Sequence, residues 1–311
     1  MNRRTPREIA IIGAPSSIGI KPYDDGTMRR LDLAPAALRQ QGLAARLGAR
    51  DRGDVTPPPY RDFVRPPMTP RNEDLVERYS RDLARHVASA DDGTFLLVLG
   101  GDCSIVLGCL SGLRRTRARV GLVYVDAHAD FATPDTSRTG SAASMCLALA
   151  VGRGDSTLAR LDGEQPLVRP EDLVIIGRRD DADAPWYGQD ILRAGPMLDL
   201  THATIRDRGI ADVFALALER VTRPGIDGFW IHVDADVVDP SEVPAVDSPE
   251  PGGLLLGELS ELLTPLVHHP DAIGLELTIY DPQLDPDRAS AARLASLLER
   301  AIGRIGGDPT S

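Results

Sequence analysis

Acidic and imidazole side chains recur at a spacing of two in two short segments of the chain. The first, DAHAD, places Asp126, His128 and Asp130 at alternate positions, and the second, DAD, does the same with Asp234 and Asp236. Alternate residues of an extended chain point to the same side. Like charges gathered in this way are costly unless a cation lies between them. The two segments therefore predict a shared site for a divalent metal ion.

A third segment, GGDCS, ends an apolar run and carries Cys103 at a place where a further ligand would fit. Carboxylates that bridge two ions roughly 3.5 Å apart would activate a water molecule as hydroxide. Oxygen and imidazole ligands point to Mn²⁺, whereas a thiolate from Cys103 shifts the preference toward Zn, Fe, Co or Ni. The alternative for Cys103 is a buried, small apolar side chain.

These segments follow short runs rich in Val, Ile and Leu, which alternate with helical patterns. We expect strands over 8–13, 94–100, 120–128, 172–179, 228–236 and 272–280, and helices over 34–48, 72–90, 104–115, 211–221, 257–269 and 287–305. Asn72 is expected to cap its helix, and residues 52–72 are expected to be irregular. The alternation is typical of a three-layer α/β fold with a central, mainly parallel sheet. Ligands bind beyond the carboxyl ends of such strands, where the acidic segments lie.

The composition narrows the function classes. The chain has 311 residues, 42 % of them hydrophobic, which is enough for one large domain over 1–311. A net charge of −11 without a basic run argues against nucleic-acid binding. No stretch approaches the roughly 20 apolar residues that span a membrane, and the N-terminus lacks a signal-peptide core. Three cysteines do not suggest a disulfide framework, so we expect a cytoplasmic protein.

These segments resemble the ureohydrolases, the family of arginases, agmatinases and their relatives. GGDCS resembles the family's GGDHS, DAHADFATPDTSRTG resembles DAHxDxxTP…SG, and HVDADVVDPSEVPAVDSPEPGG resembles SxDxDxxDPxxxPxxxTPxxGG. The resemblance covers most of the chain. It implies an arginase-like fold and the hydrolysis of a guanidino or amidine C–N bond by a hydroxide that bridges two metal ions. It also implies a homo-oligomer, a trimer or a hexamer.

The resemblance further implies a role for individual residues. The metal ligands would be the bridging Asp126 and Asp234, then Cys103 and Asp130 on one ion, and His128 and Asp236 on the other. Asp130 would also hold the hydroxide and pass a proton to the leaving amine. His232 precedes Asp234 by two residues, but the corresponding family position is not a ligand, so we expect His232 to lie behind the ligands at most.

The substrate would be held by a second set of residues. Glu276, in the segment GLELTIYDPQLD, would be the catalytic carboxylate that pairs with the cationic guanidinium, and its alternative is an ordinary salt-bridged strand residue. The remaining candidates are Ser248, Thr139, Ser141, Asp181 and Asp183. The last two could equally be surface acids.

Three positions depart from the family pattern. Cys103 stands where the family has a histidine, Ala143 aligns with a loop histidine, and Ala132 aligns with an asparagine that grips the arginine carboxylate. A branch that includes the N-hydroxyarginine hydrolase of D-cycloserine biosynthesis resembles this chain in the first two respects. The departures leave three readings open: hydrolysis of an N-hydroxyguanidine, hydrolysis of another amidine such as agmatine, guanidinobutyrate, guanidinopropionate or formimidoylglutamate, or a degenerate, non-catalytic family member.

Overall fold

The computed structural model describes residues 7–61, 65–161, 163, 165–180 and 189–303. Its strands form one eight-stranded sheet in the order β2-β1-β3-β8-β7-β4-β5-β6, and every pairing is parallel. The strands are β1 Ile9–Ala14, β2 Arg50–Asp54, β3 Phe95–Gly100, β4 Gly121–Val125, β5 Leu173–Ile176, β6 Leu198–Leu200, β7 Phe229–Asp234 and β8 Ala272–Thr278. The predicted three-layer fold with a parallel sheet is therefore confirmed.

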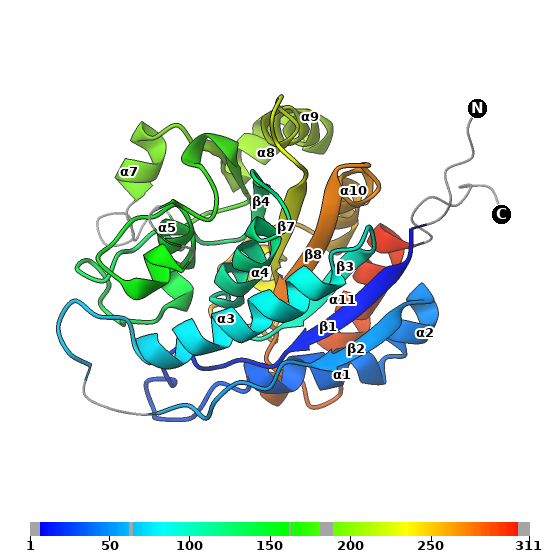
Figure 1. Cartoon of the computed structure of the whole chain (residues 1–311). Helices are drawn as coiled ribbons and strands as arrows, with labels where there is room; N and C mark the ends of the chain where they lie inside the picture. The colour runs from blue at the N-terminus through cyan, green and yellow to red at the C-terminus, as the bar shows by residue number, and fades with distance from the viewer. Residues whose placement is uncertain (1–6, 62–64, 162, 164, 181–188, 304–311) are drawn as a thin grey trace, which may run out of the picture.

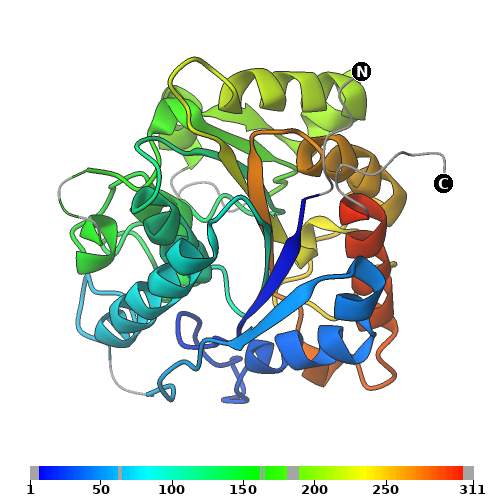
Figure 2. The ribbon, with the colours of Figure 1, turned by 45° about the vertical axis from the view of Figure 1, so that its right-hand side comes forward.

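Helices cover both faces of the sheet (Figures 1 and 2). The α-helices are α1 Ala34–Gln40, α2 Leu43–Leu47, α3 Glu73–Ala90, α4 Ile105–Arg114, α5 Cys146–Ala150, α7 Gln189–Ala194, α8 His202–Arg208, α9 Ile210–Val221, α10 Leu256–Val267 and α11 Ala289–Ile302. Helices α3, α4 and α5 pack together on one face, and α11 packs on α1, α2 and α10 on the other. Among the described residues, no helix is long and apolar enough to cross a bilayer.

Several local predictions need correction. The helix expected over 34–48 is broken into α1 and α2, because Gly42 adopts a left-handed conformation with a φ of 74°. Asn72 precedes α3 without capping it, since its side-chain amide instead donates to the carbonyl of Ile18. Strands β2 and β6 were not predicted, and β2 begins before, and runs into, the segment expected to be irregular.

The parallel sheet aligns the ends of its four central strands. Strands β3, β8, β7 and β4 are neighbours in that order, so their carboxyl ends meet at one edge. Tyr124, His232 and Glu276 are paired in one row across β4, β7 and β8. Asp234 and Thr278 are paired two residues farther along, at the strand ends. This register places one polar row directly beneath the residues at the edge.

Candidate metal centre

The DAHAD segment turns sharply as it leaves β4. The Asp126 carboxylate accepts a hydrogen bond from the His128 backbone N–H at 2.7 Å. Asp130 has a φ of 46°, an uncommon conformation for a residue other than glycine, and its carbonyl accepts from the Leu147 N–H at 3.2 Å. Asp180 accepts from the backbone N–H of Ala129 at 2.9 Å and fixes the middle of the turn. The strained turn thus holds its polar side chains at the end of β4.

The DAD segment ends β7 in a similar way. Asp234 Oδ1 accepts from the Asp236 N–H at 2.9 Å, and Asp236 Oδ1 accepts from the Ala127 N–H at 3.3 Å. The Cys103 thiol donates to Asp234 Oδ2 at 2.8 Å. Hydrogen bonds therefore link the ends of β3, β7 and β4 around one point.

The rest of the GGDCS segment explains how Cys103 reaches this point. A side chain at Gly101 would collide with the carbonyl of Ser16, so only glycine allows the loop after β1 to approach β3. Asp102 is fully buried and accepts from Ser16 Oγ at 2.8 Å and from the Gly19 N–H at 3.1 Å. Asp102 is therefore structural, and the turn that it fixes presents Cys103 to the strand ends.

Potential ligand atoms gather in two groups that share Asp126. The inner group consists of Cys103, Asp126, His232 and Asp234, all buried, and the outer group consists of Asp126, His128 and Asp236. Within each group the ligand atoms lie within 4.8 Å of one another. Five of the six predicted metal ligands are brought together in this way. Asp130 lies in neither group, and its carboxylate accepts from the Tyr124 hydroxyl at 2.7 Å.

The charges of the two groups favour a bound cation. Burial, followed by the neighbouring Asp236, raises the pKa of both Asp126 and Asp234. Burial, followed by Asp234, raises the pKa of the Cys103 thiol well above its usual range. Asp126 Oδ2 is buried and has no hydrogen-bond partner among the described residues. Divalent cations would relieve this repulsion, supply the missing partner and stabilise a Cys103 thiolate, so the residues fit a metal site.

His128 provides the exposed side of the outer group. Burial lowers its pKa, but Asp236, Asp126 and Glu250 more than offset this, so the pKa is raised overall. Its Nδ1 lies 3.0 Å from Asp236 Oδ2, and its Nε2 lies 3.9 Å from Glu250 Oε1. The pKa of Asp236 is lowered, because the attraction of His128 outweighs the effect of burial.

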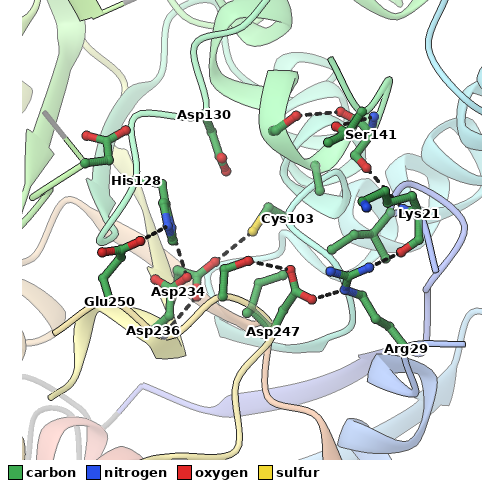
Figure 3. Close-up of a pocket in the computed structure, with 17 residues that line it drawn as sticks. Lys21, Arg29, Cys103, His128, Asp130, Ser141, Asp234, Asp236, Asp247 and Glu250 are labelled. Atoms are coloured by element: carbon green, nitrogen blue, oxygen red, sulfur yellow. Dashed lines mark hydrogen bonds and ion pairs between the residues drawn. The ribbon is translucent and has the colours of Figure 1, made fainter. Parts of the chain in front are cut away.

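A pocket of about 260 Å³ opens over the two groups (Figure 3). Asp130 reaches into it from the side opposite Asp234 and Asp236. Of the predicted substrate-binding residues, Thr139, Ser141 and Ser248 line the pocket; Asp181 and Asp183 lie outside the described residues. Ala143 also lines the pocket, and Ala132 is buried elsewhere.

Sequence reasoning missed four charged residues of the pocket: Lys21, Arg29, Asp247 and Glu250. Arg29 forms an ion pair with Asp247 in which both side chains are nearly buried. The Lys21 backbone N–H donates to Ser141 Oγ at 3.0 Å, which ties the loop after β1 to the pocket wall. The only sequence signal for Lys21 and Arg29 in the pocket is the cluster of basic residues in GIKPYDDGTMRR.

Glu276 requires a correction, because the structure does not bring it to the pocket. Its side chain is fully buried, and its Oε1 lies 2.8 Å from Nδ1 of His232. The residue at the end of β8 that lines the pocket is Ile279. Strand alternation explains the error, since Glu276 shares a face with Thr278 but lies one row deeper. A contact between Glu276 and substrate does not fit this position.

Comparison with known proteins agrees with this architecture. The sequence model of the arginase family matches residues 7–303. The chain belongs to the arginase family. It is 30 % identical over 303 residues to the arginase of Brevibacillus brevis, covering 96 % of this chain and 98 % of that protein. The solved arginase of Bacillus caldovelox superposes with a TM-score of 0.84 at 29 % identity, covering 96 % of this chain and 98 % of that one.

The fold also extends to a more distant solved structure. The proclavaminate amidino hydrolase of Streptomyces clavuligerus superposes with a TM-score of 0.72 at 20 % identity, covering 98 % of this chain and 94 % of that one. Membership of the arginase family makes this chain an amidinohydrolase, an enzyme that acts on C–N bonds in linear amidines. The family depends on paired metal ions, and the two ligand groups are the candidate sites in this member.

Proposed function

We propose that this chain hydrolyses the guanidino or amidine group of a small, arginine-derived substrate, with one divalent ion in each of the two ligand groups. The observation that carries the proposal is the convergence of both groups beneath one pocket. When bound, two such ions lower the pKa of a water molecule and supply hydroxide at neutral pH. The chain's own residues must then orient the substrate and move protons.

Asp130 is proposed to move the protons. Burial, followed by Asp126, raises its pKa well above the usual carboxyl range, which favours proton uptake. The Tyr124 hydroxyl holds Oδ2, and the carboxylate reaches into the pocket (Figure 3). Asp130 would take a proton from the nucleophile and return it to the departing amine. The loop histidine that the family pattern implies is not available to assist it, because position 143 is alanine.

Lys21 supports a substrate that carries a carboxylate. Its ammonium group pairs with Asp24, whose side chain is 94 % exposed, so this ion pair is weak and can be exchanged. Arg29, by contrast, is held by Asp247. We propose that Lys21 binds the substrate carboxylate, with Thr139, Ser141 and Ser248 as hydroxyl partners. This favours N-hydroxyarginine or another guanidino acid over agmatine, and Asp181 and Asp183 stay proposed contacts for an amino group.

The experiment is a substrate panel combined with metal analysis. The purified chain should bind two divalent ions and release urea or hydroxyurea from guanidino acids or their N-hydroxy forms. Replacing Lys21 with Met should raise KM for the acids by about tenfold, the loss of one ion pair, without affecting agmatine. Absence of metal would support the non-catalytic alternative. Metal-loaded enzyme that hydrolyses no member of the panel would refute the proposed reaction.

The proposal also covers the identity of the metal ions, the cellular compartment and the oligomeric state. Oxygen and imidazole donors favour Mn²⁺ in the outer group, whereas Cys103 favours Zn, Fe, Co or Ni in the inner one. Three buried, free cysteines suit a reducing compartment such as the cytoplasm. The likeness to ureohydrolases supports a homotrimer or hexamer, which light scattering after gel filtration would test.

A further inference from the structure

The inner group contains an imidazole that the family pattern does not assign. His232 lies on β7 two residues before Asp234, so both side chains point to the same face of the sheet. One of its ring nitrogens lies within 4.8 Å of ligand atoms of Cys103, Asp126 and Asp234. The His232 side chain is fully buried.

The hydrogen bond with Glu276 determines which ring nitrogen of His232 is left to face the inner group. Its Oε1 lies 2.8 Å from Nδ1 of His232, and a carboxylate can only accept a hydrogen bond. In the neutral imidazole, Nδ1 then carries the proton and Nε2 presents a lone pair. Histidines that bind metals are usually held by a carboxylate in this way. The Tyr124 ring, stacked on the imidazole at 4.1 Å and 3°, fixes the plane of the imidazole.

Among the residues that the structure describes, Nε2 of His232 has only a poor hydrogen-bond partner. Thr278 Oγ1 lies 3.5 Å away, which is long for a hydrogen bond, and the same oxygen lies 3.6 Å from Cys103 Sγ. Asp126 Oδ2, in the same group, is buried and has no hydrogen-bond partner in the described part of the chain. One unsatisfied carboxylate oxygen and one weakly bonded imidazole nitrogen thus accompany a thiol and a carboxylate in one buried place, which is the chemistry of a metal-binding site.

We propose that His232 is a ligand of the inner metal ion through Nε2, together with Cys103, Asp126 and Asp234, an inference that rests on the metal-dependent function proposed above. Glu276 is then the positioning residue for His232. Asp130 lies outside the group, where Tyr124 holds it in the pocket for proton transfer. One sulfur, one nitrogen and two carboxylate donors suit Zn²⁺ or Co²⁺ better than Mn²⁺.

The proposal is tested with the full-length chain loaded with Co²⁺. X-ray absorption of the wild type should show sulfur and two imidazoles per pair of ions, one from His128 and one from His232. The variant His232→Asn keeps an amide near the Nδ1 position but lacks Nε2. It should bind one Co²⁺ instead of two and lose the thiolate-to-cobalt absorption band. His86→Asn, on the exposed side of α3, is the matched control and should change neither.

Glu276→Gln separates positioning from ligation. It keeps the imidazole and the sulfur band but should weaken the inner ion by about 10- to 100-fold. A single imidazole per pair of ions in the wild type overturns the assignment, whether or not the variants fold. So does a His232→Asn protein that keeps two ions with unchanged affinity, and in that case the proposed hydrolase function still stands. A wild type that binds no metal overturns both proposals.

Discussion

The inner and outer ligand groups share Asp126 but differ in depth and in donor chemistry. The inner group is fully buried and offers a thiol and the strand-borne His232. The outer group offers His128, whose side chain is 24 % exposed at the pocket, and the carboxylate of Asp236. In terms of the proposed function, the difference means that the inner group would hold an ion within the sheet, whereas the outer group would face the substrate.

The largest effect is expected from the residue that the groups share. Replacing Asp126 with Ala removes a ligand from both, so both ions should be lost, and activity should fall by at least about 10³-fold. Elemental analysis and urea release measure the two outcomes. Asp212→Asn, on the exposed face of α9, is a control that should keep both properties. An Asp126→Ala enzyme that retains two ions would remove the basis for treating the groups as linked.

The next largest effect isolates the outer group. His128→Ala should release the outer ion only, so that one Co²⁺ per chain and the thiolate-to-cobalt band both remain. Activity should fall about a hundredfold, because the ion nearest the substrate is missing. Absorption spectroscopy with elemental analysis distinguishes the ions. Loss of the sulfur band in this variant would show that the two groups are not separate.

Metal preference distinguishes the groups more finely. Cys103→His replaces the soft donor of the inner group, which should move its preference from Zn²⁺ toward Mn²⁺ by about tenfold. Competition between the two ions, read by elemental analysis, measures this change. Cys103→Ala removes the donor and should lower inner-ion occupancy instead. Full occupancy and full rate in Cys103→Ala would exclude the thiol as a ligand.

The pH dependence gives the smallest effect. Without metal, burial and then neighbouring acids raise the pKa values of Asp126 and Asp234. A carboxyl with a raised pKa stabilises the folded chain below its ordinary value, and this contribution is lost as pH rises through the raised pKa. Bound cations replace those protons, so the increase in Tm on adding metal should grow by a few degrees between pH 5 and 8. Calorimetry checks this, and a pH-independent increase would contradict it.

The sequence predicted those features that depend on local patterns. Apolar runs indicated six of the eight strands of the described sheet, and the spacing of two in DAHAD and DAD pointed to residues of both candidate ligand groups. Strand β2, with the sequence RDRGD, has no apolar pattern because it is an exposed edge strand paired on one side only. Lys21 and Arg29 reach the pocket through the course of a loop, which no spacing encodes.

Glu276 and His232 show that the depth of a side chain below the pocket cannot be predicted from the sequence alone. Both lie in strands that were predicted, and alternation correctly indicates the face on which each side chain lies. Whether a residue ends in the pocket or one row beneath it depends on the register between β7 and β8. A likeness between motifs does not supply that register, so Glu276 was expected in the pocket, and its contact with His232 was not predicted.

The connection between Cys103 and Asp234 also bears on how the enzyme is made. These residues touch although 131 positions separate them in the chain. Such contacts form late, because the intervening chain must be ordered first. During synthesis, neither ligand group can be complete before β7 has left the ribosome. Metal uptake is therefore expected to follow assembly of the central sheet, so that a nascent or truncated chain would remain without its ions.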